Sequence, residues 1–177
     1  MCQRLSILLL SLFFCPNLLW AVEPLAWANL RISGNIIDES CEVGTTSADV
    51  HIGDFPQSDF TAVGDVSAAK QFDISLLKCS PEITGSNITF SGTSAGSGNT
   101  DLLALSRTSG SAEMASGVAV QILDSVGVPI ALNKASRLQP LTQGDNTMHF
   151  QLRYKAIAVP VKAGEANAVM YFDLSYQ

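Results

Sequence analysis

Apolar side chains recur at every second position in several short segments of this chain, and this period constrains the fold more than any other feature of the sequence. Successive side chains of an extended strand point to opposite faces, so such alternation predicts a strand with one buried face. The turn-rich stretches 92–98, 109–117 and 143–146 separate some of these segments. Short strands at this spacing predict one all-β sandwich, with a weak hint of helix at 61–70. The alternating segments are 30–36, 72–76, 88–90, 118–122, 148–154 and 166–176.

The first residues predict a secretory leader. Arg4 gives a positive start, residues 5–19 form an apolar run, and the small residue Ala21 follows it. We expect cleavage after Ala21, although the Ala-Trp-Ala sequence at 26–28 offers a later site. The apolar run is shorter than the roughly 20 residues that cross a bilayer. We therefore expect a leader at 1–21 and a mature chain that is not embedded in a membrane.

The cysteines predict one disulfide. Cys2 and Cys15 leave with the leader, which keeps Cys41 and Cys79 in a protein bound for an oxidising compartment. An even pair in an exported domain indicates a disulfide, worth roughly 3–4 kcal/mol by loop closure. A zinc site would need about four Cys or His ligands in close pairs. Only His51 and His149 could join the two cysteines, and their spacing in the sequence gives no reason to expect them near each other. We expect no metal site.

Charge and motifs argue against nucleic-acid binding and catalysis. The formal net charge is −6, and the ten Lys and Arg are scattered without a run, whereas a nucleic-acid partner needs a basic face. Residues 92–96 fit the G-x-S-x-G nucleophile pattern, with Asp124 and His149 following in hydrolase order. That motif requires a strand-to-helix turn in an α/β sheet, and here it lies in a Ser/Gly run. We expect a loop at this place, no catalytic residue, no cofactor and no enzyme.

Three motifs, in this order along the chain, carry a resemblance to a known family. A glycine, Gly34, precedes Cys41 by seven residues and is followed by the apolar pair at 36–37. The segment 70–79 alternates and ends on the second cysteine, and the C-terminal segment carries Gly164 fourteenth from the end and an aromatic residue in the penultimate position. With the leader, these motifs resemble the type 1 fimbrial pilins of chaperone–usher systems, most closely the small adaptor subunits near the fibre tip.

The resemblance implies an immunoglobulin-like β-sandwich that lacks its seventh strand and is completed by a strand from another protein. Such completion is a form of β-augmentation. A periplasmic chaperone lends the strand first, and the N-terminal extension of a neighbouring subunit replaces it during export through an outer-membrane usher. The resemblance therefore implies a donor extension at 22–38, a pilin domain at 39–177, and a place in the fimbrium on the bacterial cell surface.

The same resemblance assigns residues to the two halves of this interaction. Gly34 is the position where a side chain would collide with the acceptor core, and the chaperone would grip the terminal carboxylate of Gln177. The apolar side chains of the donor strand are Leu30, Ile32 and Ile36. The acceptor groove and the chaperone-binding C-terminal strand comprise Gly164, Met170, Phe172, Leu174, Tyr176 and Gln177.

Other interpretations stay open at this point. The segment 30–36 could be the internal first strand of a complete sandwich, and Gly34 a simple bulge. The chain could be the major shaft pilin, a terminator subunit or a self-complete secreted immunoglobulin-like binding module. A tip adhesin is disfavoured, because such proteins of this family carry an additional lectin domain and lack a donor extension.

Overall fold

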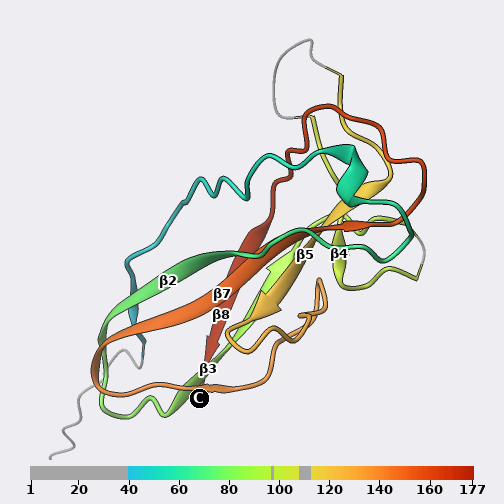
Figure 1. Cartoon of the computed structure of the whole chain (residues 1–177). Coiled ribbons are helices and arrows are strands. Elements are labelled where there is room, and N and C mark those ends of the chain that lie inside the picture. Colours follow the sequence, from blue (N-terminus) through green and yellow to red (C-terminus); the bar gives the residue numbers. More distant parts are fainter. Residues whose placement is uncertain (1–39, 97, 108–112) are drawn as a thin grey trace, which may run out of the picture. The chain divides into compact units, whose positions relative to one another are not determined.

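The computed structural model describes residues 40–96, 98–107 and 113–177, which form two antiparallel β-sheets (Figure 1). The larger sheet has the order β1-β2-β7-β5-β4, and the smaller has the order β6-β3-β8. One turn of 3₁₀ helix, η1, spans Gln57–Asp59, and no helix in these ranges is long and apolar enough to span a membrane. The strands are β1 (Glu42–Val43), β2 (Lys70–Cys79), β3 (Gly85–Ser91), β4 (Leu102–Leu103), β5 (Val118–Asp124), β6 (Gln139–Pro140), β7 (Gly144–Ala156) and β8 (Tyr171–Tyr176).

The facing sides of the two sheets form the hydrophobic core. Phe90 of β3 and Phe150 of β7 come from opposite sheets and meet edge to face, with ring centroids 5.1 Å apart. Phe72 packs against both rings, and aromatic pairs of this kind add about 0.5–1.5 kcal/mol beyond their burial. The alternation seen in the sequence is confirmed on β2, β3 and β7, where these even-numbered residues are buried: Ile74, Leu76, Ile88, Phe90, Met148, Phe150 and Leu152. β5 differs from the prediction, because residues 118–123 are buried on both faces.

A disulfide joins Cys41 to Cys79, as the sequence predicted. Both residues are buried, and the chain continues from Cys41 directly into β1, which pairs with β2. The N–H of Ser80 also donates to the carbonyl of Ser40 at 3.3 Å. The covalent bond therefore fixes the segment that enters the domain against the far end of β2.

The hint of helix at 61–70 is wrong, because the chain makes a turn there. The carboxylate of Asp65 accepts hydrogen bonds from the N–H groups of Thr61 and Ala62, at 2.7 and 2.8 Å. These bonds, with that to Ala62 contributing most, lower the pKa of Asp65. Gly64 adopts a φ of +101°, which side chains other than glycine rarely allow. Side-chain bonds to the backbone compete with helix formation, and here they close the turn.

The last strand is shorter than the sequence suggested. We expected a strand over 166–176, whereas β8 begins at Tyr171. Tyr171 pairs with Ser91, the last residue of β3, so β3 provides no ladder partner for the residues before Tyr171. The alternation of burial nevertheless continues back through 166–170. These residues therefore extend the inward face of β8 without being part of its ladder.

Candidate functional site: an open groove beside the last strand

One edge of β8 is open in the part of the chain that the structure describes. β8 pairs with β3, and no other described strand pairs with it. Gly85 and Gln177 exchange two backbone hydrogen bonds, of 2.9 and 3.2 Å. Because such pairs alternate along an antiparallel ladder, the odd-numbered residues of β8 direct their backbone groups to β3. The backbone N–H and C=O groups of Phe172, Leu174 and Tyr176 therefore face the open edge.

The inward face of β8 is only partly covered. Leu174 lies opposite Ile88, and Phe172 lies opposite Phe90. Ile88 and Phe90 are 0% exposed, whereas Phe172 and Leu174 remain partly exposed although they belong to the same core. Both members of such a cross-strand pair should be buried in a closed sandwich. The difference shows that, among the residues that the structure describes, the layer is incomplete on the β8 side.

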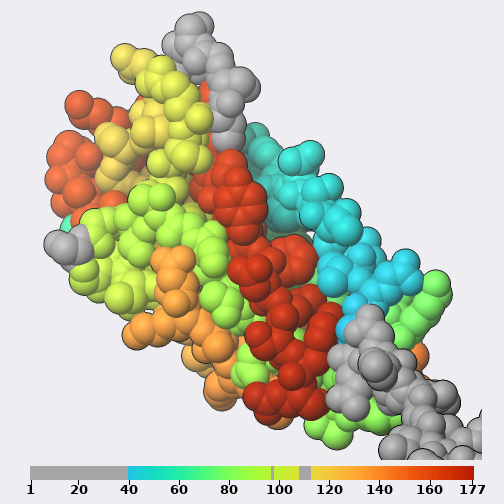
Figure 2. All heavy atoms as spheres, turned by 180° about the vertical axis from the view of Figure 1, so that it is seen from behind, coloured from blue at the N-terminus to red at the C-terminus, as the bar shows by residue number. Residues whose placement is uncertain are grey.

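An extended segment at 48–52 forms the opposite wall of this groove. Val50 and Ile52 point into the core and are partly buried, while their odd-numbered neighbours are exposed. Residues 48–52 and 166–170 line a cavity of about 590 Å³. Figure 2 shows this arrangement, with the C-terminal segment in red beside the early segment in cyan. The floor of the cavity is apolar and consists of Phe72, Leu103, Val120, Leu152 and Tyr154.

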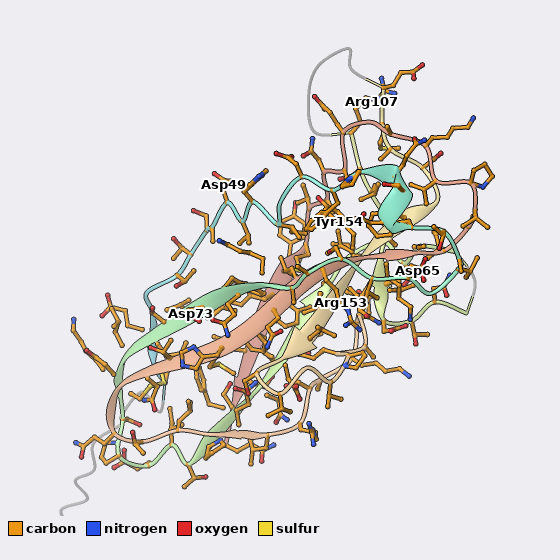
Figure 3. The ribbon with its side chains drawn as sticks, in the orientation of Figure 1. Asp49, Asp65, Asp73, Arg107, Arg153 and Tyr154 are labelled. Atoms are coloured by element: carbon orange, nitrogen blue, oxygen red, sulfur yellow. A yellow bond between two sulfur atoms is a disulfide. The ribbon has the colours of Figure 1, made fainter. Side chains whose placement is uncertain are left out.

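The two ends of the groove differ. At one end the hydroxyl of Tyr176 lies 3.5 Å from the carbonyl of Cys41, and burial raises the pKa of Tyr176. At the other end Tyr154, labelled in Figure 3, donates to the carbonyl of Ala166 at 2.8 Å. Burial is the main cause that raises the pKa of Tyr154, and Asp54 adds to it. Tyr154 also lines a second cavity of about 450 Å³, which shares Ala166 and Asn167 with the groove.

Gly164 lies at the head of the C-terminal segment rather than on the groove face of β8. A Cβ atom there would come within 2.5 Å of the backbone N of Ala115 and the carbonyl oxygen of Glu113. The backbone of Glu165 donates to Glu113 at 2.8 Å and accepts from Ala115 at 2.9 Å. Only glycine fits this close approach. The residue therefore anchors the start of the segment that leads into β8.

Gln177 ends the chain beside β3. Its main-chain oxygen accepts hydrogen bonds from the N–H of Thr84 at 2.7 Å and of Gly85 at 3.2 Å. Its side-chain amide lies 3.2 Å from the side-chain oxygen of Asn87. The terminus is thus held at the tip of the smaller sheet, next to the Tyr176 end of the groove.

Four of the acceptor residues predicted from the sequence lie along one face of β8 and of the segment just before it. They are Met170, Phe172, Leu174 and Tyr176. The nominated donor residues Leu30, Ile32, Gly34 and Ile36 lie outside the described residues, as does the leader. Sequence reasoning missed the opposite wall. The alternation of Val50 and Ile52 was visible but extends over only two apolar positions, which is too short to indicate a strand.

The residues of the hydrolase-like pattern are engaged elsewhere. Ser94 lies in the loop after β3 and bridges to Leu103. Asp124 accepts hydrogen bonds within the turn that follows β5 and pairs with Arg137 at 2.8 Å. His149 pairs with Asp73 at 2.7 Å on the exposed side of β2 and β7. The loop interpretation of residues 92–96 is confirmed.

An immunoglobulin-like sandwich with an open strand edge and an uncovered core face is the fold of a pilus subunit. The family model described as "Fimbrial protein" matches residues 30–177, so the chain belongs to the fimbrial protein family. It is a structural subunit of fimbriae, which are assembled on the cell surface, and not an enzyme.

Individual relatives agree with this assignment. The chain is 46% identical over 152 residues to the fimbrial-like protein YcbU of Escherichia coli K12, covering 84% of each chain. It is 35% identical over 176 residues to the type-1 fimbrial protein, A chain, of Salmonella typhi, covering 94% of each. A subunit in the structure of a chaperone–usher pilus shares the fold, with a TM-score of 0.65 and 21% identity over 87% of this chain and 98% of that chain.

Proposed function

We propose that this chain is a minor or adaptor subunit of its fimbria and that it polymerises by donor-strand exchange, thereby supporting bacterial adhesion. After removal of residues 1–21, the extension 22–38 inserts into the groove of a neighbouring subunit, and the groove of the domain 39–177 receives a strand in turn. Before assembly a periplasmic chaperone occupies the groove, and an outer-membrane usher catalyses the exchange. The observation that carries this proposal is the open edge of β8 above a partly exposed core face.

The physical argument is that such a surface is unstable alone. An open edge with exposed apolar side chains is a template for pairing with another strand. An inserted strand would bond to the free backbone groups of Phe172, Leu174 and Tyr176 and cover their side chains. In the sequence of 22–38, Leu30, Ile32 and Ile36 have the period needed to fill the groove. Burial of three aliphatic side chains is worth roughly 1.5–3 kcal/mol each before ordering costs.

Donor-strand exchange is tested by mixing two purified complexes of chaperone and subunit and following the products on gels. We expect a slow appearance of subunit–subunit complexes in which the chaperone has been released. A subunit that lacks residues 22–38 should accept a strand but donate none. If the truncated subunit still extends chains as a donor, the extension is not the donor strand.

A second candidate role is the major shaft subunit. One relative, the Probable major fimbrial subunit LpfA of Escherichia coli O157:H7, is 32% identical over 151 residues, and this name favours the shaft. The two roles differ in copy number. Quantitative mass spectrometry of sheared fimbriae should find a few copies per fibre for an adaptor, and one copy per repeat for a shaft subunit. Dominance of this chain in the fibre would contradict the adaptor role.

A further inference from the structure

The outward face of β8 carries one negatively charged side chain. Asp173 is exposed on β8, opposite Thr89 of β3. It is the single charged residue of 166–177, and in the described ranges no Lys, Arg or His forms an ion pair with it. The sequence of 22–38 contains a single cation, Arg31, flanked by the apolar residues that would face inward.

We propose that Asp173 sets the register of the inserted strand by pairing with Arg31 of a second copy of this chain. The proposal rests on the donor-strand function proposed above. Residues of the donor that alternate with the groove-filling side chains point outward, as Asp173 does on β8. The even-numbered residues of β8 direct their backbone groups to the donor, and the odd-numbered residues, such as Asp173, direct theirs to β3. An odd-numbered residue of β8 therefore forms a non-hydrogen-bonded pair with the donor residue opposite it. Such pairs have the closest side chains in an antiparallel ladder.

This register also matches the sizes of the inward side chains. With Arg31 opposite Asp173 in an antiparallel pair, Gly34 lies opposite Met170 and Ile36 lies opposite Ala168. Gly34, the smallest donor residue, thus meets the long side chain of Met170. The bulky side chain of Ile36 meets the small side chain of Ala168. Ala168 and Met170 line the cavity of about 590 Å³, so Ile36 enters this cavity.

The neighbouring registers lose both matches. A shift of two residues in one direction puts Arg31 opposite Ser175 and Ile36 opposite Met170, so two bulky side chains compete and the cavity beside Ala168 has no apolar occupant. A shift in the other direction puts Gly34 opposite Ala168, which leaves a gap between two small residues. Voids and overpacking both cost stability. Charge and volume therefore select the same register independently.

A parallel orientation fits the cavity less well. With Arg31 opposite Asp173 in a parallel pair, Gly34 would lie opposite Tyr176, and Ala28 and Ala26 would lie opposite Met170 and Ala168. Two methyl groups would fill the cavity of about 590 Å³ beside 166–170 less well than the side chain of Ile36. Every strand pair of the described sheets is antiparallel, and the antiparallel donor continues that pattern.

The single turn of 3₁₀ helix, η1, supplies a matched control. Asp59 is an exposed carboxylate on this turn, and it lines neither the groove nor the second cavity beside it. Asp59→Lys makes the same charge reversal as Asp173→Lys, but outside the site that receives the strand. This substitution should not affect the exchange.

The experiment uses the full chain bound to its chaperone as acceptor and a synthetic peptide of residues 22–38 as donor. Each single charge reversal should slow exchange about three- to tenfold relative to the wild-type pair. The two single reversals are the Asp173→Lys acceptor with the wild-type peptide, and the wild-type acceptor with the Arg31→Glu peptide. The combination of the two reversed charges should restore the rate to within about twofold. Asp59→Lys should slow exchange with the wild-type peptide by less than twofold. Failure of the double reversal to restore exchange overturns the pairing.

A cross-linking measurement reads the register directly. A Ser33→Cys peptide is offered to acceptors carrying Val169→Cys, Tyr171→Cys or Asp173→Cys under mild oxidation. The proposed register puts position 33 opposite Tyr171, so that acceptor should form the disulfide in high yield. A predominant link to position 169 or 173 overturns the register while leaving donor-strand exchange intact. If the wild-type peptide does not insert into the wild-type acceptor at all, the proposed function fails, and this inference fails with it.

Discussion

Replacement of Gly164 by alanine tests how the C-terminal segment is anchored. The added Cβ would lie 2.5 Å from the backbone N of Ala115 and from the carbonyl oxygen of Glu113. These atoms belong to the backbone and cannot swing away as a flexible side chain would. They also make the two hydrogen bonds that hold Glu165, at 2.8 and 2.9 Å. The substitution must therefore push two backbone segments apart.

The expected cost follows from these two effects. Overpacking against a fixed neighbour costs roughly 1–3 kcal/mol, and weakening of two backbone hydrogen bonds adds about 0.5–1.5 kcal/mol for each. We expect Gly164→Ala to lower the free energy of unfolding by about 3 kcal/mol. For a domain of this size that corresponds to a fall in Tm of roughly 6–12 °C.

The assay is urea unfolding of the full chain that carries a second copy of residues 22–38 after Gln177, which fills the groove in every variant. Gly127→Ala is the matched control. Gly127 has a φ of +84°, but a Cβ there meets nothing within 4 Å, so its substitution carries only the backbone strain of about 1–2 kcal/mol. If Gly164→Ala costs no more than Gly127→Ala, the close backbone approach does not anchor the segment.

Three further predictions concern export, the disulfide and the donor strand. Intact-mass analysis of periplasmic protein should give a chain starting near Val22, and a mass that retains the apolar run would contradict the leader. Replacement of both Cys41 and Cys79 by alanine should lower the stability of the donor-fused chain by roughly 3–4 kcal/mol in urea unfolding, and native protein with two titratable thiols would exclude the disulfide. Gly34→Leu should block donation of the strand to a neighbour, because overpacking costs roughly 1–3 kcal/mol or more, and it should not impair folding on the chaperone. Asn35→Leu should donate nearly normally, because its side chain points outward. Both variants are compared in the gel assay of donor-strand exchange. Equal donation by both variants would refute the assigned face of the strand.

Strand alternation was enough to predict the parts of the fold that have one buried face. Ile74 and Leu76 on β2, and Ile88 and Phe90 on β3, lie in the core as their spacing indicated. Burial also alternates along β8, where the even-numbered residues are the less exposed ones. Period two reports directly which side chains face the core, so these elements required no knowledge of their neighbours.

The sequence did not predict features that depend on neighbouring chain segments. Gln121 lies on the outward face of β5, yet it is 1% exposed. Its amide donates to Asp101 at 2.6 Å and accepts from Arg153 at 2.7 and 2.9 Å, a network drawn from three separated segments. In the same way, the two-residue strands β4 and β6 are defined by their partners rather than by their own composition.

The start of β8 and the groove wall show the same limit. Residues 166–170 have strand-like alternation, but β3 ends at Ser91 and provides no ladder partner for them. The wall at 48–52 becomes recognisable only when it lies beside 166–170 across the cavity. An open groove is a property of two segments that are distant in the sequence, so no local pattern could specify its width.

The central claim is that the domain lacks a strand which residues 22–38 of another copy can supply. The most direct measurement compares the free energy of unfolding of the mature chain alone with that of the same chain fused, through a short linker after Gln177, to a second copy of 22–38. Because the fusion covers the free edge of β8 and buries three aliphatic side chains, we predict a gain of several kcal/mol and a monomer in place of aggregates. The same fusion carrying Gly34→Leu should gain much less. A mature chain that is already monomeric, and as stable alone as when fused, would contradict the account.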